Sequence, residues 1–302
     1  MRAIAVVAVL LGVAAGAAQP PAAAVPSVRA DGPMIIAHRG GTGDFPENTI
    51  LAITNAVQAG VDGLWLTVQA SSDQVAMLYR PTDLSALTNG AGAVNSKTAL
   101  ELQQLNAGFN FAGVDGYPYR ENAIGIPTLE QAVSVIPTGM PLFLDLKQQP
   151  AQPVISAVVD VLRRTGSTAR SVLYSTDAAI TDLAVQQRDL NVAESRDLTR
   201  ERLLNMALVH RCEPAPSRGI WAGFELHREV TVTEAFTLGT GVSEVDAELW
   251  DPASVECFTS QPGSRVMGFA VNTYDDYRFA AKIGLDAVLV DSPRAARQWR
   301  QG

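Results

Sequence analysis

The sequence predicts an α/β fold in which parallel strands and helices alternate and close into a TIM-type (β/α)8 barrel. Short apolar runs alternate with amphipathic stretches along most of the chain, as expected for a parallel sheet covered by helices. About eight strand candidates occur without a break in the repeat, so one closed barrel is favoured over a doubly wound sheet. The 302 residues, 47% of them hydrophobic, suffice for one large core.

Each predicted element follows from a local pattern. Strands are short apolar runs, and helices show apolar residues at helical spacing and often end at glycine. We expect strands at 34–37, 63–68, 75–79, 142–144, 171–174, 190–193, 266–271 and 287–290, with a further candidate at 242–245. We expect helices at 47–59, 154–164, 177–188 and 274–283, and another that has Thr128 as its N-cap. Residues 195–262 show the weakest pattern, and an insertion between barrel units is expected there.

The N-terminal segment is predicted to be a signal peptide. Arg2 precedes an almost uninterrupted run of small apolar residues over 3–18, which Gln19 and two prolines end. A membrane anchor is the alternative, but this run is shorter than the roughly 20 residues that span a bilayer. The protein is therefore expected to be secreted or extracytoplasmic, without an integral membrane span. The predicted organisation is a signal peptide at 1–24 with cleavage near 18 or 24, a linker at 25–32 and a barrel domain at 33–302.

Cysteine content and charge limit the environment and the partners. Cys212 and Cys257 are the two cysteines, and an even number in an oxidising compartment favours one disulfide over two buried free thiols. The net charge is −8 with the acidic residues scattered, which argues against nucleic acid and against an anionic membrane surface as the main partner. A small phosphorylated ligand remains compatible with this charge. The oligomeric state is left open.

The candidate site lies where the predicted strands end, because the active site of a parallel barrel is built at the C-terminal ends of its strands. The first apolar run ends in His38 and Arg39. An imidazole transfers protons near neutral pH, and a guanidinium holds phosphate oxygens in a bidentate fork. This combination suits phosphoryl chemistry, with a structural histidine in a loop as the ordinary alternative.

The whole sequence resembles the glycerophosphodiester phosphodiesterase family. The matching segments follow the family's order and lie at 36–40, 46–49, 59–63, 87–90, 126–130, 144–147, 270–272, 284–287 and 291–293. The resemblance implies a TIM-type barrel that cleaves glycerophosphodiesters into an alcohol and glycerol phosphate. It also implies a divalent cation, Ca²⁺ or Mg²⁺, as the cofactor.

The metal-binding positions depart from the family's pattern. The second strand of the family ends Glu-Leu-Asp, and two carboxylates spaced in this way face the same side and hold one cation. Here Trp65 and Thr67 occupy these positions, and Asp145 shortens the family's glutamate on the fourth strand. Asp145 alone is a poor cation site, so no cofactor is expected. The sequence leaves open whether Asp115 or Glu121 restores one.

The phosphate-binding positions are retained. Arg39 and Lys147 are expected to bind phosphate, with His38 as the acid or base. Tyr79 stands where the family has its second catalytic histidine, but its ordinary pKa of about 10 favours packing over proton transfer. Arg80 follows it and is either a cation that counters phosphoryl charge in place of a metal or a surface arginine.

Other polar and aromatic residues are expected to support the site. Glu47 and Asn48 match a family segment, and Glu47 is expected to open a helix and to orient Arg39 or His38. Trp65 is either a platform for a ligand or a filler of the space that the metal shell has vacated. The remaining histidines, His210 and His227, show no metal-like spacing and are interpreted as structural or surface residues.

Three functions are compatible with these features. The first is a binding protein on an enzyme fold that holds a glycerophosphodiester, an inositol-type phosphodiester or another phosphorylated compound. The second is an active phosphodiesterase that needs no metal and uses His38 and Arg80. The third is a structural or interaction protein of the cell envelope with a vestigial pocket, because fold alone does not decide function.

Overall fold

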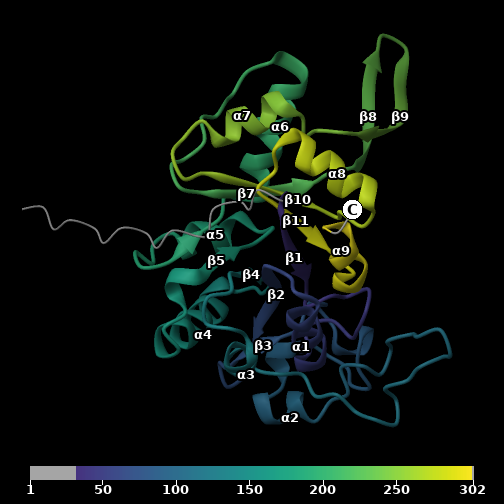
Figure 1. The fold of residues 1–302 in the computed structure, drawn as a ribbon, viewed down its shortest axis with the longest axis vertical. Coiled ribbons are helices and arrows are strands. Elements are labelled where there is room, and N and C mark those ends of the chain that lie inside the picture. Colours follow the sequence, from purple (N-terminus) through teal and green to yellow (C-terminus); the bar gives the residue numbers. More distant parts are fainter. Residues whose placement is uncertain (1–31, 301–302) are drawn as a thin grey trace, which may run out of the picture.

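The computed structural model describes residues 32–300 and shows eight parallel strands in barrel order with helices on the outside (Figure 1). The strands follow the order β6-β5-β4-β2-β1-β11-β10-β7. A backbone hydrogen bond from Glu194 N to Trp221 O (2.7 Å) bridges the seam between the two end strands. The predicted signal peptide and nearly all of the predicted linker lie outside the described residues. The barrel strands are β1 (Met34–His38), β2 (Gly63–Ala70), β4 (Leu142–Leu146), β5 (Ser171–Tyr174), β6 (Asn191–Val192), β7 (Trp221–Glu225), β10 (Arg265–Phe269) and β11 (Ala287–Val290).

The helices begin and end at residues that supply the missing hydrogen bonds. Thr128 caps its helix as predicted and forms a capping box with Gln131. The first helix begins at Ile50 and not at Glu47, because Thr49 is extended and its hydroxyl accepts from Ala52 N. The helices are α1 (Ile50–Ala59), α2 (Ala99–Gln103), α3 (Leu129–Val135), α4 (Ala151–Arg164), α5 (Ala178–Ala184), α6 (Arg196–Val209), α7 (Pro252–Thr259), α8 (Tyr274–Ile283) and α9 (Pro293–Trp299), with 3-10 turns at Leu84–Ala86, Val94–Ser96 and Thr168–Arg170.

One predicted strand has a different role in the structure, and one barrel strand was not predicted. The run predicted at 75–79 forms β3 (Ala76–Leu78), which pairs antiparallel with the end of β2 and is not a barrel strand. The missing barrel strand is β7, which lies inside the region that was predicted to be an insertion. Its sequence, Trp-Ala-Gly-Phe-Glu, contains a central glycine and few β-branched residues, so it lacks the signal of an apolar strand.

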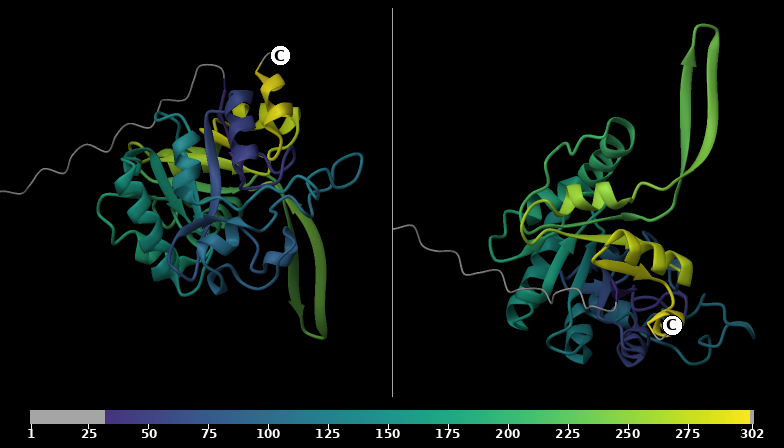
Figure 2. Two further views of the ribbon diagram at one scale, coloured as in Figure 1. Left: turned by 90° about the horizontal axis from the view of Figure 1, so that it is seen from below. Right: turned by 45° about the horizontal axis from the view of Figure 1, so that its top comes forward.

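The insertion is a hairpin of β8 (Arg228–Phe236) and β9 (Gly239–Ala247) that stands clear of the barrel (Figure 2). The candidate strand at 242–245 belongs to this hairpin. The rest of 195–262 supplies α6, β7 and α7 to the barrel. Cys212, after α6, forms a disulfide with Cys257 in α7, with 5.6 Å between their Cα atoms. The pairing expected from the sequence is therefore present in the structure.

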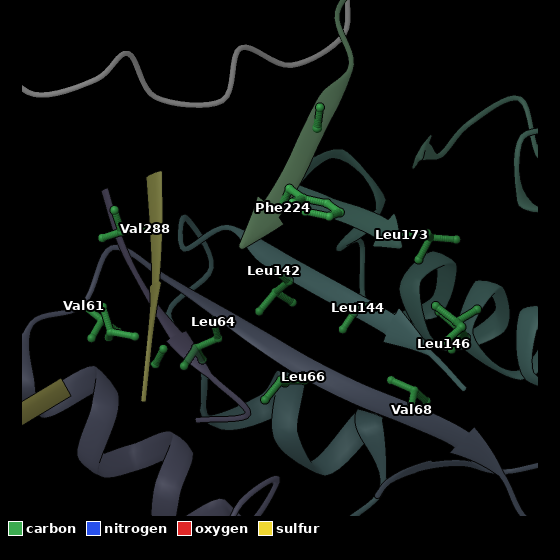
Figure 3. Packing of buried hydrophobic residues seen from close by; sticks show 14 of the residues in the cluster. Val61, Leu64, Leu66, Val68, Leu142, Leu144, Leu146, Leu173, Phe224 and Val288 are labelled. Carbon is green, nitrogen blue, oxygen red and sulfur yellow. The ribbon is translucent and has the colours of Figure 1, made fainter. Parts of the chain in front are cut away.

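Side chains alternate across the barrel wall, and this alternation separates the core from the site. On β2 and β4 the residues at even positions, among them Leu66 and Leu144, point outwards and pack against the helices (Figure 3). The odd positions point inwards. A second cluster consists only of strand residues and those next to them, which places it inside the barrel: Met34, Ile36, Trp65, Phe143, Val172, Tyr174, Ala193, Trp221, Met267, Phe269, Ala287 and Leu289.

Candidate functional site

The histidine that ends β1 is held by the residue that follows β11. His38 Nδ1 lies 2.6 Å from Asp291 Oδ1, and Asn272 Nδ2 donates to the other oxygen of Asp291 at 2.8 Å. The hydrogen bond from His38, together with that of Asn272, lowers the pKa of Asp291. An ionised carboxylate only accepts hydrogen bonds, so Nδ1 carries the proton and Nε2 is left as the basic nitrogen.

The loop after β1 positions an arginine beside a glutamate. Arg39 adopts a left-handed conformation (φ 51°), and its Nη1 donates to Glu47 Oε2 at 2.6 Å. Asn48 is also left-handed (φ 59°), and its Oδ1 accepts from Thr67 N at 2.9 Å. Glu47 therefore orients Arg39, one of the two residues expected from the sequence. Asn48 fixes the loop to β2.

Trp65 and Thr67 point into the barrel and do not form a cation site. Trp65 is 5% exposed and packs against Tyr174, Phe269 and Phe143 with ring-centroid distances of 4.9, 5.2 and 6.1 Å. This packing favours the space-filling role of Trp65 over that of a ligand platform. Thr67 is fully buried beside Asp145, its register partner on β4.

Asp145 and Lys147 form an ion pair at the end of β4. Lys147 Nζ lies 3.2 Å from Asp145 Oδ1 and donates to Thr176 Oγ1 at 2.5 Å. Asp145 is only 7% exposed, and burial raises its pKa although Lys147, Arg39 and His38 all act in the opposite direction. The site thus keeps a buried carboxyl whose charged form is disfavoured by its surroundings.

Asp145→Asn is expected to stabilise the protein at neutral pH. A carboxyl whose pKa is raised by folding contributes most below its unfolded pKa, about 4, and that contribution is lost as pH rises through its folded pKa. The neutral amide of asparagine does not titrate and so avoids this loss. The variant should therefore have a higher free energy of unfolding than the unmodified protein at neutral pH and nearly the same one in acid. Urea unfolding between pH 3 and 8 measures it.

Asp291→Asn is the matched control because the pKa of Asp291 is lowered. Its contribution to stability is present above the unfolded pKa and is lost as pH falls through the folded pKa. The amide is therefore expected to destabilise the protein at neutral pH and to have little effect in acid. If Asp145→Asn also destabilises the protein at neutral pH, the pair with Lys147 outweighs the burial of Asp145.

Arg80 and Lys147 line the same hollow at the barrel mouth. The hollow has a volume of about 530 Å³ and lies over the ends of β4 and β5, where Gln148, Ser175 and Thr176 complete its polar wall. Arg80 is exposed there. The structure thus places Arg80 beside a cation of the predicted phosphate site, which favours a role in charge compensation over that of an isolated surface arginine.

Tyr79 has a packing role. Its side chain is buried, and its hydroxyl lies 3.1 and 3.0 Å from the carbonyl oxygens of Asp83 and Leu84, which accept its proton. Burial raises the pKa of Tyr79 well above its ordinary value. A hydroxyl held in this way is a poor proton donor to a ligand, so the geometry favours packing over the role of general acid.

Buried side-chain atoms without a hydrogen-bond partner gather at this end of the barrel. Within residues 32–300 each of them belongs to the loop after β1 or to an inward position near the end of β2, β4 or β5. Such atoms are destabilising unless a ligand or water satisfies them. Their common location indicates a polar binding site. They are Arg39 Nε, Glu47 Oε1, Asn48 Nδ2, Thr67 Oγ1, Tyr174 OH and Asp145 Oδ1, the last of which has only its ion pair with Lys147.

The donor set at the barrel mouth does not fit a hard divalent cation. The carboxylates of Glu47 and Asp145 each contact a cationic side chain, Arg39 and Lys147 respectively. Ca²⁺ takes six to eight oxygen ligands and Mg²⁺ takes six in fixed geometry. Within residues 32–300, no three His, Cys, Asp or Glu side chains are grouped so as to hold a metal ion.

The other candidate residues lie away from this site. Asp115 and Glu121 are exposed in the loop before α3. His210 ends α6 in a left-handed conformation, and His227 Nε2 lies 3.0 Å from Asp276 Oδ1 beside the hairpin. None of the four lines the hollow over β4 and β5; His38, Arg39 and Asp145 do not line it either, but Asp145 contacts Lys147, which does.

Four residues of the candidate site were not assigned a role from the sequence: Asp291, Tyr174, Glu225 and Arg196. Asp291 directly follows an apolar run, so the rule that selected His38 also points to it. Tyr174 is the last residue of β5 and was accessible to the same rule. Glu225 and Arg196 were not, because β7 and α6 were not predicted as elements.

Comparison with known proteins identifies the family of this chain. A profile of the glycerophosphoryl diester phosphodiesterase family matches residues 38–295, from the histidine that ends β1 into α9. The chain belongs to this family. It is also 66% identical to the uncharacterized protein Rv2277c of Mycobacterium tuberculosis over 294 residues, which cover 97% of this chain and 98% of that protein.

Solved structures of this family share the barrel. The glycerophosphoryl diester phosphodiesterase domain of Rv2277c superposes with a TM-score of 0.85 at 68% identity, over 89% of this chain and 99% of that one. An Oleispira antarctica phosphodiesterase, solved with the product sn-glycerol-3-phosphate, superposes with a TM-score of 0.63 at 23% identity, over 89% and 97%. At this level of identity, the second comparison shows a shared fold only. In the described part of the chain, every helix is too short or too polar to cross a bilayer.

Proposed function

We propose that the protein binds a glycerophosphodiester or a related small phosphorylated compound at the barrel mouth, and that its hydrolysis is lost or strongly weakened. The observation that carries the proposal is the hollow that Lys147 and Arg80 line. Lys147 contacts Asp145, whose register partners Thr67 and Tyr174 carry buried hydroxyls without a hydrogen-bond partner within residues 32–300. The hollow is lined by two cations and by Asp177, and the resulting excess of one positive charge suits the single negative charge of a phosphodiester. The glycerol phosphate found in the Oleispira antarctica relative supports this ligand class.

Weak hydrolysis follows from the residues beside the phosphate-binding cations. His38 is oriented as a base by Asp291, but the hydroxyl of Tyr79 donates its hydrogen bond to backbone carbonyls and is a poor candidate for the opposing acid. Trp65 and Thr67 supply no carboxylate, and the donors that remain do not fit a cation. General acid–base catalysis accelerates a reaction roughly 10²- to 10⁴-fold. Without a general acid opposite His38, the protein is expected to be a slow enzyme at best.

We further propose that the protein acts outside the cytoplasm on compounds derived from phospholipids. The sequence of residues 1–24 and the Cys212–Cys257 disulfide support export, since disulfides persist in oxidising compartments. Fractionation of cells that express the full chain tests this proposal. Recovery of an uncleaved, reduced protein in the cytoplasm would contradict it.

Lys147→Gln is expected to weaken binding of sn-glycerol 3-phosphate roughly 10- to 100-fold, because a charge-assisted hydrogen bond contributes about 1.5 to 3 kcal/mol. Glutamine keeps a donor for Thr176, so the local structure should persist. Titration calorimetry measures the affinity. Lys282→Gln on α8 makes the same charge change far from the hollow and should bind normally. Equal affinity of the two variants would contradict the assignment of Lys147.

The second candidate function is slow hydrolysis without metal, which the His38–Asp291 pair favours. His38 Nε2 would accept the proton of the attacking group while Arg39, Lys147 and Arg80 counter the charge on phosphorus. Release of glycerol phosphate is measured with Ca²⁺, with Mg²⁺ and with chelator. Turnover that survives the chelator and disappears in His38→Ala supports this function. Turnover that requires metal would contradict our interpretation of Trp65 and Thr67.

A further inference from the structure

A buried tyrosine hydroxyl lies on β5, the strand next to the one that leads into Lys147. Tyr174 ends β5 and, as the register partner of Asp145, points into the barrel. Its side chain is 3% exposed, and its hydroxyl lies near Arg196 but makes no hydrogen bond of good geometry within residues 32–300. Its ring is fixed between Trp65 and Phe269, with centroid distances of 4.9 and 6.0 Å. A rigid hydroxyl in this position is suited to a hydrogen bond with a ligand.

An ion pair stands next to this hydroxyl. Arg196 Nη2, at the start of α6, lies 2.6 Å from both carboxylate oxygens of Glu225, the last residue of β7. The guanidinium lies over the ring of Phe224 at 4.5 Å, which fixes its plane. Both side chains keep partial access to solvent, with 15% and 25% of their surface exposed. A solute in the mouth can therefore reach them.

The hydroxyl and the ion pair belong to one pocket region. Burial raises the pKa of Tyr174 to about 12, and Arg196, Asp145 and Glu225 all influence it, Arg196 lowering it and the two carboxylates raising it. Tyr174 is the register partner of Asp145, which contacts Lys147, and its ring lies 6.0 Å from that of Phe269, the register partner of Glu225. Tyr174 therefore lies between the Asp145–Lys147 pair and the Arg196–Glu225 pair. A ligand whose phosphate lies at Lys147 would extend its other end toward this pair.

We propose that Tyr174, Arg196 and Glu225 bind the alcohol part of the phosphodiester and select an uncharged, hydroxyl-rich alcohol such as a polyol. The proposal rests on the proposed function, because it places the phosphate at Lys147. A polyol hydroxyl both donates and accepts. Glu225 accepts, the remaining N–H groups of Arg196 donate, and the hydroxyl of Tyr174 does either.

The charge balance disfavours a cationic head group. Arg228 Nη1 also contacts Glu225, at 3.4 Å, so two arginines surround one carboxylate and the local charge is positive. A quaternary ammonium would be repelled by the two arginines and would offer no hydrogen bond to Tyr174. A neutral polyol meets no net repulsion and satisfies the unpaired hydroxyl.

Calorimetric titration of the purified protein with three compounds tests this selectivity. The compounds are glycerophosphoinositol, glycerophosphocholine and sn-glycerol 3-phosphate, and product formation is followed in parallel. We expect glycerophosphoinositol to bind more tightly than glycerophosphocholine. Tyr174→Phe should weaken glycerophosphoinositol roughly 3- to 10-fold, the range of one neutral hydrogen bond, and should leave the other two compounds unchanged. The variant removes an unpaired hydroxyl, so its stability in urea should not fall.

The outcomes separate this inference from the proposed function. Lys147→Gln should weaken all three compounds, whereas Tyr174→Phe and Glu225→Gln should weaken only glycerophosphoinositol. Equal binding of glycerophosphoinositol and glycerophosphocholine, or an unchanged affinity in Tyr174→Phe, would overturn the polyol subsite while the phosphate site stands. If none of the compounds binds, the proposed function fails and the subsite fails with it.

Discussion

Trp65→Glu is expected to lower the free energy of unfolding by at least about 3 to 5 kcal/mol, the range for truncation of a large buried aromatic side chain. Glutamate is the residue that the family's pattern would place here. In this chain, however, the indole fills the barrel between Phe143, Tyr174 and Phe269. Its removal leaves a cavity, and an ionised carboxylate in that cavity adds a desolvation penalty.

Urea unfolding of the variant, with Trp65→Phe as the control, measures this loss. Phenylalanine keeps an aromatic ring among the same neighbours and should lose much less stability than glutamate. A further measurement adds Ca²⁺ or Mg²⁺ to the Trp65→Glu variant. If the variant is as stable as the unmodified protein, the packing of Trp65 does not stabilise the barrel as we infer. If millimolar Ca²⁺ or Mg²⁺ restores its stability, the single substitution is enough to create a cation site.

The fold was predictable where the pattern along the chain is strong. Seven of the eight barrel strands coincide with apolar runs, because a strand buried on both faces must be apolar throughout. The exceptions are informative. β3 has the composition of a barrel strand, but the short turn after β2 forces it to pair antiparallel. β7 has a glycine at position 223, where the ring of Phe269 occupies the space of a side chain, so packing and not strand propensity explains its sequence.

The ends of the strands predicted part of the candidate site. His38, Arg39 and Lys147 close apolar runs, Asp145 lies within one, and Lys147 contacts Asp145 at 3.2 Å. The partners of these residues come from distant parts of the chain, such as Asp291, which lies 253 residues after His38. Short local patterns carry no information on such pairs. They arise only when the barrel closes.

The ion pair beside the barrel seam was also beyond sequence reasoning. Glu194 follows β6, and its Oε2 lies 2.7 Å from Arg202 Nη1 with both side chains almost fully buried. Arg202 also donates from Nε to Pro214 O at 2.5 Å and lies over the ring of Phe258 at 4.6 Å. Charged residues in a weakly patterned segment suggest a surface. Here Arg202 lies on the buried side of α6, where it contacts Glu194 beyond the end of β6 and Phe258 of α7.

Arg202→Met is expected to lower the free energy of unfolding by about 3 to 5 kcal/mol, because it leaves Glu194 buried without a counter-charge. Methionine fills much of the same volume, so the loss reports mainly the stranded carboxylate. The double variant Arg202→Met/Glu194→Gln has no unpaired carboxylate. In the unmodified protein Thr199 Oγ1 donates to Glu194 Oε2 at 2.9 Å, and the amide oxygen of glutamine can accept the same hydrogen bond. The double variant should therefore recover much of the stability, and urea unfolding of all four proteins gives the coupling energy. Additive losses would mean that the packing of Arg202 over Phe258, and not its charge, holds α6 to the barrel.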